Sequence, residues 1–364
     1  MIFFIVFLLA IFFTLLENKN SVAPELLPRR KKSVFIGAKF LGLMMFILCA
    51  LRGIDVGIDT SHYYESFKPG ISRFVEVGYW LIRHITLLFG GSFQVFLFLY
   101  ALAALCPLYK FLSRESANVS FSLLIYLSFS NYFYPEAFNT IRTAAAIGFF
   151  VLGLSYWSQK EYKLGLLLFI VSCLFHISSI VACVIVVIAQ VVHRISRKTT
   201  YIAIILSIVF GIVFQTGFSE YAETISLWLA GVPGNMAEYY TRYFSSLEES
   251  EFNMVGTLSN MLPFSMFAIL LYDKENSDNL FYKLFLIGVI MSNVFISVAL
   301  VYRITMFFTT LLIIVLPNTL KRQKGFSRTL SLSLIVLMLL WYVYKLFIST
   351  SDNMAGIIPY SFCF

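Results

Sequence analysis

Long apolar runs separated by short polar segments dominate this 364-residue chain. A helix needs about 20 predominantly apolar residues to cross a bilayer core of about 30 Å, so runs of this length predict transmembrane helices. They lie at residues 1–16, 34–51, 92–109, 119–134, 142–157, 201–217, 255–272, 284–301, 304–320 and 329–348. The first run has no basic segment before it and no small-residue cleavage site, which favours a true span over a signal peptide.

One apolar run, residues 164–192, does not fit a single span. It is 29 residues long, carries His176 in its middle, and has basic residues on both flanks. Two short helices that turn at His176–Ser179 would return the chain to the side from which it started, and we interpret the run as such a hairpin. When this hairpin is counted, the chain is expected to be an all-α polytopic integral membrane protein of about 10–12 transmembrane helices. These helices are expected to form one membrane domain over residues 1–364.

Composition excludes the other broad classes. Hydrophobic residues make up 59% of the chain and charged residues 13%, whereas a soluble domain has about a quarter of its residues charged. The five cysteines form no CxxC pair and no cluster with metal-ligand spacing, which argues against a disulfide scaffold and a zinc site. The net charge of +8 comes from short clusters between apolar runs, a pattern typical of membrane topology signals rather than of nucleic-acid binding.

The basic residues predict the orientation of the chain. Cytoplasmic loops of membrane proteins carry an excess of Lys and Arg. One set of alternate loops holds eighteen Lys and Arg residues against seven acids, and these segments are 17–33, 110–118, 158–163, 193–200, 273–283 and 321–328. We assign this set to the inside, which places both termini outside. An external loop at 52–91, with an amphipathic helix near 74–89, and an external acidic loop at 218–254 follow from the same assignment.

Arginine is strongly favoured over lysine on the predicted outer side. Six of its seven basic residues are arginines, namely Arg52, Arg73, Arg83, Arg142, Arg242 and Arg303. A guanidinium is a planar donor that grips phosphate or carboxylate at two points and keeps its charge where water is scarce. This bias predicts a bound anion on the outer side.

The polar residues concentrate in a few segments of that side. The loop at 52–67 combines Arg52, Asp55 and Asp59 with two glycines and Tyr63, more than a plain interfacial turn requires. Glu76 is the acid nearest to the expected interfacial helix, on which Tyr79 and Trp80 fit an aromatic belt.

Further along the chain, Asn139 and Arg142 are three residues apart on a predicted helix and are expected to share one of its faces. Arg142 then either pairs with Glu136 or binds an anion, because a charge entering a span needs a partner. His176 would bond a neighbouring helix or face outward at the hairpin tip, and Tyr302 and Arg303 join two apolar runs on the same side. The acidic 218–254 loop is interpreted as a substrate-contacting lid or as a solvated face.

Together these motifs resemble those of the EpsG-type members of the Wzy polysaccharide polymerases. The resemblance covers residues from about 50 to the end. It rests on Arg52-Gly-x-Asp-x-Gly-x-Asp-Thr-x-x-Tyr, Glu76-x-Gly-Tyr79, Asn139-x-x-Arg142, Phe175-His176-x-Ser178, Tyr302-Arg303 and Pro359-Tyr360. It implies a fold similar to lipid-dependent (GT-C-like) glycosyltransferases and a location in the bacterial inner membrane, with the active face in the periplasm.

The resemblance also implies an activity. Such enzymes transfer a growing glycan from undecaprenyl diphosphate to the non-reducing end of a lipid-linked repeat unit, building O-antigen, capsule or exopolysaccharide. Arg52, Arg142 and Arg303 would then stabilise the leaving diphosphate, and His176 would orient it or the acceptor. Asn139, Tyr63 and Tyr302 join them as substrate-binding candidates. The base would be Asp59, Glu76 or Asp55, in that order of preference. No metal or cofactor is expected, and whether a chain-length co-polymerase takes part is left open.

Three other functions remain as alternatives. A flippase for lipid-linked sugars also needs outward arginines, but it would show internal repeats and charges deep within several spans. A membrane O-acetyltransferase would need its polar cluster on the side of acetyl-CoA, which is the inside. An O-antigen ligase shares nearly every feature above and differs only in its acceptor.

Overall fold

The computed structural model describes residues 1–20, 35–68, 76–129, 133–230, 254–296, 298–347 and 354–363. These residues are helical, apart from loops and one isolated antiparallel bridge between Arg52 and Phe362. The chain divides into two compact units. Unit 1 comprises Met1–Val191 and Thr310–Phe364, and unit 2 comprises Val192–Thr309.

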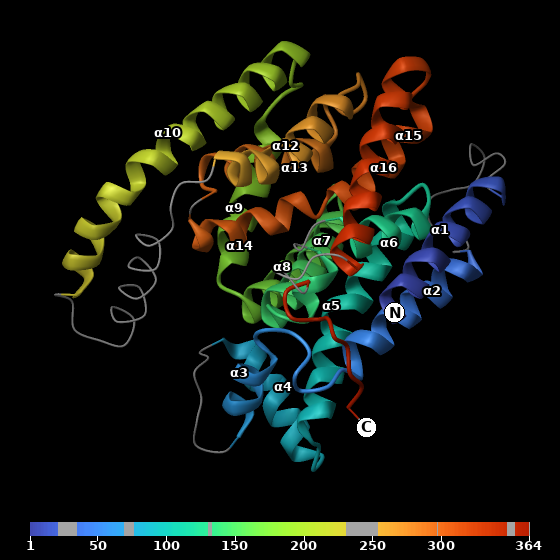
Figure 1. The fold of residues 1–364 in the computed structure, drawn as a ribbon, viewed down its shortest axis with the longest axis vertical. Coiled ribbons are helices and arrows are strands. Elements are labelled where there is room, and N and C mark those ends of the chain that lie inside the picture. Colours follow the sequence, from blue (N-terminus) through green and yellow to red (C-terminus); the bar gives the residue numbers. More distant parts are fainter. Residues whose placement is uncertain are drawn as a thin grey trace. The chain divides into compact units, whose positions relative to one another are not determined.

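Unit 1 contains most of the helices (Figure 1). In chain order they are α1 (Ile2–Asn20), α2 (Ile36–Ala50), α3 (Thr60–Phe67), α4 (Val77–Leu88), α5 (Phe93–Glu115), α6 (Val119–Ser128), the short 3₁₀ helix η2 (Tyr134–Ala137), α7 (Ile141–Ser158), α8 (Tyr162–Phe175), α9 (Ser178–Val191), α15 (Leu312–Arg322) and α16 (Gly325–Phe347). Helix α7 lies at the centre, packed against α5 and α8, while α1 packs against α2 and α6. Gly148 of α7 and Ala104 of α5 allow these two helices to pack closely. A Cβ at Gly148 would come within 2.4 Å of the Ala104 carbonyl oxygen.

Unit 2 is built around α13. Its helices are α10 (Arg197–Ala230), α12 (Met254–Leu270), α13 (Leu280–Val294) and α14 (Ala299–Thr309), and α13 packs against the other three. A buried amide joins them, because Asn293 Nδ2 donates to Ser207 Oγ of α10 and Ser265 Oγ of α12, each at 3.0 Å. Such polar contacts between apolar helices are typical of membrane bundles.

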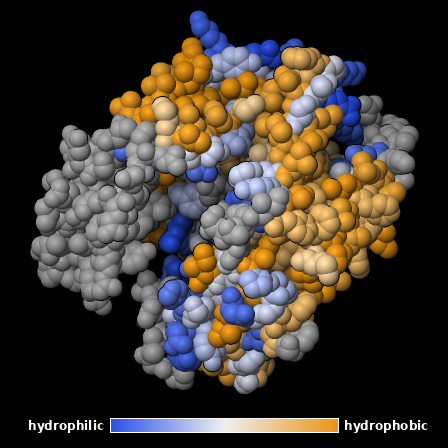
Figure 2. All heavy atoms as spheres, in the orientation of Figure 1, coloured by the Kyte–Doolittle hydropathy of each residue, from blue (hydrophilic) through white to orange (hydrophobic). Residues whose placement is uncertain are grey.

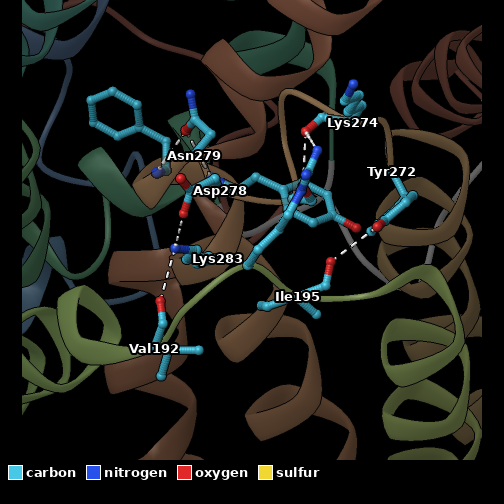
Figure 3. A network of polar contacts seen from close by, with 11 residues as sticks. Val192, Ile195, Tyr272, Lys274, Asp278, Asn279 and Lys283 are labelled. Carbon is cyan, nitrogen blue, oxygen red and sulfur yellow. Dashed lines mark hydrogen bonds and ion pairs between the residues drawn. The ribbon is translucent and has the colours of Figure 1, made fainter.

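A polar network fixes one end of unit 2 (Figure 3). Lys283 Nζ donates to the Val192 carbonyl at 2.9 Å and to Asp278 at 2.8 Å, and the Tyr272 hydroxyl donates to the Ile195 carbonyl at 2.9 Å. The Lys283 side chain is 6% exposed, so its charge depends on these partners. The hydrogen bond and charge of Lys283 lower the pKa of the exposed Asp278 carboxyl. The network joins two segments that are both predicted to lie inside.

The chain is a polytopic all-α membrane protein, as the apolar runs predict. Among the described residues, the helices long and apolar enough to cross a bilayer are Phe93–Glu115, Ile141–Ser158, Arg197–Gln215, Val301–Arg322 and Gly325–Phe347, with shorter apolar helices beside them. Large side chains such as Leu206 and Leu337 are about 60% exposed. Figure 2 shows a broad apolar surface over α1, α2 and α16, too extensive for a soluble monomer.

The predicted spans agree with the helices in most places and differ in three. The 164–192 run is confirmed as a broken hairpin, with α8 ending at Phe175 and α9 beginning at Ser178. The 119–134 run is wrong as one helix, because α6 ends at Ser128 and Pro135 begins a separate turn. The 304–320 run lies within the candidate span Val301–Arg322, which a turn at residues 310–311 divides into α14 and α15. Helix α10 continues past 217 to Ala230, and the rest of the predicted 218–254 loop lies outside the described residues.

Candidate active site

The polar loop that follows α2 is held in place by the end of the chain. Residues 354–363 run along it, so that the last and one of the first segments of unit 1 lie side by side (Figure 1). The Gly53 and Gly57 N–H groups donate to the carbonyls of Ser361 and Gly356 at 2.9 and 2.8 Å, and the Cys363 N–H donates to Leu51 at 3.1 Å. The C-terminal tail is therefore part of the loop's framework.

Glycine is required at one point of this framework. Gly57 has a φ of +93°, which residues with a Cβ rarely adopt. A Cβ there would also lie 3.0 Å from both Asn139 Oδ1 and Thr60 Oγ1. The second glycine of the 52–59 motif thus serves close packing of the loop against the segment before α7.

The Arg52 guanidinium is buried in this framework. It is 1% exposed, and its Nη1 and Nη2 donate to the carbonyls of Cys49 at 2.9 Å and Phe138 at 3.0 Å. It also lies 5.1 Å from the centre of the Phe138 ring. Burial lowers the pKa of this group. The geometry favours a structural role for Arg52 over the expected contact with an anion.

Asn139 likewise joins segments of the framework. Its Nδ2 donates to the carbonyls of Pro135 at 3.2 Å and Ala355 at 3.1 Å, and its Oδ1 accepts from the Asp59 N–H at 3.4 Å. Helix α7 begins only at Ile141, so the expectation that Asn139 and Arg142 share a helix face is wrong. Asn139 instead positions the start of α7, from which Arg142 projects.

Arg142 forms an ion pair with Glu76, the residue that precedes α4. The two side chains are 14% and 15% exposed, so the pair is largely but not fully removed from water. Glu136, the partner considered from the sequence, accepts a hydrogen bond from Thr140 at 2.5 Å. The structure thus brings together one predicted binding residue and one predicted base.

Three tyrosines surround this pair. Tyr63 of α3 forms a hydrogen bond with Arg142, and the hydroxyls of Tyr79 and Tyr100 lie close enough to interact with its charge. All three are at most 4% exposed. Burial raises the pKa of Tyr79 to about 12, so its phenol stays protonated at neutral pH and can donate a hydrogen bond. We call Tyr63, Glu76, Tyr79, Tyr100 and Arg142 the Glu76–Arg142 centre.

Glu76 Oε2 and the Tyr100 hydroxyl are buried and have no hydrogen-bond partner among the described residues. Buried polar groups are nearly always paired, and leaving one unpaired costs about 1–3 kcal/mol. Unpaired oxygens beside an arginine are the arrangement expected of a site that receives a polar ligand.

Tyr100 and Tyr79 were missed from the sequence as site residues. Tyr79 fits an aromatic belt equally well, and Tyr100 lies within an apolar run with no polar neighbour. The signal available was the hydroxyl of Tyr100 inside a predicted span, because a buried phenol needs a partner. Only the packing of α4 on α5 shows that both reach the same point.

The tip of the α8–α9 hairpin lies beside the Glu76–Arg142 centre. A Cβ at Gly78 would come within 2.8 Å of the Phe175 ring, and the rings of Phe175 and Tyr100 are 6.1 Å apart. His176 follows directly, is 4% exposed, and accepts the Ser178 N–H at Nδ1 over 3.1 Å. His176 is therefore placed near the centre with a defined ring orientation.

The remaining predicted residues make other contacts or lie in other parts of the chain. Asp55 is exposed and accepts from Ser361 Oγ at 2.8 Å, while Asp59 is half-buried directly before α3. Arg83 donates to the carbonyls of Phe67 and Lys68 and so ties α4 to α3. Tyr302 and Arg303 belong to α14 of unit 2. Arg73 and Arg242 lie outside the described residues.

The centre offers the groups needed for transfer from a phosphate ester. It holds a guanidinium that stabilises negative charge, a carboxylate that accepts a proton, and phenols that donate hydrogen bonds. Among the described residues, no group of three or more His, Cys, Asp or Glu side chains is placed to hold a metal ion.

Comparison with known proteins gives one match. A family model, described as the EpsG family, matches residues 38–362, which include all residues of the centre and the loop framework as far as Phe362. No curated protein and no solved structure matches the chain.

Proposed function

The chain belongs to the EpsG family, and from this membership and the Glu76–Arg142 centre we propose that it is a polysaccharide polymerase. The proposed reaction transfers a growing glycan from undecaprenyl diphosphate to the non-reducing end of a lipid-linked repeat unit. The product is an O-antigen, capsule or exopolysaccharide chain, and undecaprenyl diphosphate is released.

The observation that carries this proposal is the pairing of Glu76 with Arg142 beside unpaired oxygens. A structural ion pair satisfies its own hydrogen bonds, whereas here Glu76 Oε2 and the Tyr100 hydroxyl have no partner among the described residues. A sugar hydroxyl can donate to the first, and a phosphate oxygen or sugar hydroxyl can accept from the second. The centre thus matches a substrate with both hydroxyl and phosphate groups.

The reaction follows from these groups. The acceptor hydroxyl gives its proton to Glu76 as its oxygen attacks the anomeric carbon of the donor glycan. The bond between this carbon and the phosphate oxygen breaks, and the diphosphate leaves with the electron pair. Arg142 exchanges part of its contact with Glu76 for the departing charge, and the protonated phenol of Tyr79 adds a hydrogen bond. Charge stabilisation of this kind is usually the largest catalytic contribution.

Glu76 fits the role of base better than the two aspartates. Asp55 is exposed and engaged with Ser361 of the C-terminal tail, and the backbone of Asp59 is held by Asn139. Glu76 forms an ion pair with Arg142, the arginine proposed to receive the leaving group. The ion pair holds a carboxylate and a guanidinium next to each other, so one bound substrate can reach both groups.

The location proposed for the reaction is the periplasmic face of the bacterial inner membrane. The support is the charge of the loops, since the loop that contains the 52–59 motif and Glu76 belongs to the set that is poor in Lys and Arg. Lipid-linked repeat units that have already been moved across the membrane would meet the enzyme on this side.

The glycan pattern of a deletion strain tests this function. Deletion of the gene should replace a polysaccharide ladder with single repeat units, because export and ligation continue while polymerisation fails. Complementation with Glu76→Gln or Arg142→Ala should leave single units, whereas Glu65→Gln, which alters an exposed glutamate of α3, should restore the ladder.

Other patterns would replace the proposal with one of its alternatives. Loss of all units from the cell surface would favour a flippase or a ligase. A complete ladder that lacks only acetyl groups would indicate an acyltransferase.

A further inference from the structure

An apolar groove runs along the lipid-facing side of unit 1. It has a volume of about 450 Å³ and is lined by α4, α5, α7 and α8. Its walls are almost entirely hydrocarbon, and Lys110 is its one charged residue. Two of its lining residues, Ile85 and Leu102, are 37% and 42% exposed, so the groove is open to the surroundings of the helices.

The groove begins next to the Glu76–Arg142 centre. Phe175 connects the two, because it lines the groove and its ring lies 6.1 Å from that of Tyr100, a residue of the centre. The stacked ring of Phe149, 5.5 Å from Phe175, continues the wall. Two helices contribute to both the centre and the groove. Helix α4 begins directly after Glu76 and supplies Ile82 to the groove, while α5 supplies Tyr100 to the centre and Leu102 to Lys110 to the groove.

The length and ends of the groove indicate what it holds. From Leu99 to Lys110, α5 advances by about 16 Å at 1.5 Å per residue, which is half of a bilayer core of about 30 Å. Lys110 lies in a segment predicted to be inside, whereas the Glu76–Arg142 centre lies at the other end, in loops predicted to be outside. A ligand in the groove would therefore extend from the centre into the hydrocarbon layer.

We propose that this groove binds the isoprenoid chain of the lipid-linked substrate, and so places the attached diphosphate at Arg142. The inference rests on the proposed function, which supplies a ligand with a charged head and a long hydrocarbon tail. The sugar does not fit the groove, because hydroxyl groups would find almost no polar partner there. The contact of Phe175 with Tyr100 connects this groove to a polar centre that can hold the charged head of the same ligand.

Photo-cross-linking tests the site without requiring activity. The purified protein in nanodiscs is labelled with a diazirine-bearing undecaprenyl diphosphate, and the labelled peptides are mapped. We expect the label on α4, α5 and α8 around the groove, and competition by unlabelled undecaprenyl diphosphate but not by phosphatidylethanolamine. Equal competition by the phospholipid would show a general acyl site and overturn the proposal, as would a label confined to other helices.

Variants within the groove provide the second measurement. Ala103→Trp fills the groove and should lower cross-linking by the labelled lipid. It should also raise KM for the full-length lipid substrate about tenfold, which is the effect of removing about two methylene groups of the ligand from an apolar site. A substrate with a short isoprenoid chain should show a much smaller change in KM. Leu102→Trp, at a more exposed lining position, serves as a second variant if Ala103→Trp does not fold. Leu337→Trp on exposed α16 is the matched control.

The two proposals fail separately in these measurements. If the groove is labelled, and unlabelled undecaprenyl diphosphate prevents this labelling, but the protein does not polymerise its substrate, the groove proposal stands and the proposed function is wrong. Polymerisation that is unchanged in Ala103→Trp and Leu102→Trp would remove the groove proposal and leave the function.

Discussion

Arg142 and Arg52 are both buried arginines near the same end of unit 1, yet their surroundings assign them different tasks. Arg52 donates to backbone carbonyls at 2.9 and 3.0 Å, which no substrate could replace without opening the loop. Arg142 faces a carboxylate and a tyrosine hydroxyl, partners that a ligand can exchange. The contacts of the two side chains therefore indicate different roles for Arg52 and Arg142, which the sequence alone places in one group of outer arginines.

Replacement of Arg52 should affect stability. Arg52→Ala removes the guanidinium donors to the carbonyls of Cys49 and Phe138, and Phe138 keeps only the longer contact from Thr60 Oγ1 at 3.4 Å. The expected cost is about 2 kcal/mol. We expect a lower Tm of the detergent-solubilised protein, measured by fluorescence-detected size-exclusion chromatography after heating. Arg328→Ala, at an exposed position of α16, is the control and should change the Tm little. An unchanged Tm in Arg52→Ala would contradict the structural role.

Replacement of Arg142 by lysine should affect turnover. Lys keeps the charge but lacks the planar fork that can hold Glu76 and a phosphate oxygen together. Arg142→Lys should therefore lower kcat by about 10²-fold, the size of one lost charge-stabilising contact, with a smaller change in KM. The assay is polymerisation of a lipid-linked repeat unit by purified protein. A rise in KM with kcat unchanged would indicate that Arg142 only binds substrate.

At the scale of the elements, the C-terminal tail and the loop after α2 form one structure. Their hydrogen bonds involve backbone groups of both segments, and the Tyr360 hydroxyl donates to the Leu48 carbonyl at 2.8 Å. The loop in turn leads into α3, which carries Tyr63 to Arg142. Contacts far from the Glu76–Arg142 centre thereby determine its geometry.

Removal of residues 354–364 should thus reduce activity while most helices stay folded. The loop would lose the carbonyls that accept from Gly53 and Gly57, and α3 would lose its fixed position. We expect at least a tenfold loss of kcat/KM with a nearly unchanged far-UV circular dichroism spectrum. A truncated protein with full activity would show that the tail does not position the site. Replacement of the exposed Phe326 by Ala serves as a control that leaves the tail intact.

The positions of most helices could be predicted from the sequence because apolar length alone decides them. The α8–α9 hairpin was predicted from His176 and the flanking charges, since one helix would bury a polar residue and place the two basic segments on opposite sides of the membrane. Helix ends were less predictable. Pro135 is a sequence signal for the separation of η2 from α6, whereas the turn between α14 and α15 leaves no mark on hydropathy.

The candidate site could be predicted only in part. Polar residues that follow apolar runs identified Glu76, Arg142 and Tyr63 as candidates. Their pairing could not be predicted, because it depends on how α3, α4 and α7 meet in space. The same limit explains why Arg52 and Arg142 were indistinguishable and why Tyr100 was overlooked.

At the scale of the whole molecule, the distribution of charge makes a prediction about orientation. The excess of Lys and Arg in alternate loops places both termini outside the cytoplasm. A reporter active only in the periplasm, such as alkaline phosphatase, should be active when fused after residue 364 and inactive when fused after residue 324. Fluorescent-protein fusions at the same points should show the reverse. The opposite pattern would place the Glu76–Arg142 centre at the cytoplasmic face.

The most direct test of the account uses purified protein and one lipid-linked repeat unit carrying a fluorescent sugar. The wild-type protein should convert it to a ladder of longer lipid-linked glycans, with undecaprenyl diphosphate released. Glu76→Gln should lower kcat by about 10²–10⁴-fold, the usual contribution of a general base, while Glu65→Gln retains the ladder. A wild-type protein that forms no ladder, or a Glu76→Gln protein that forms one at the normal rate, would contradict the account.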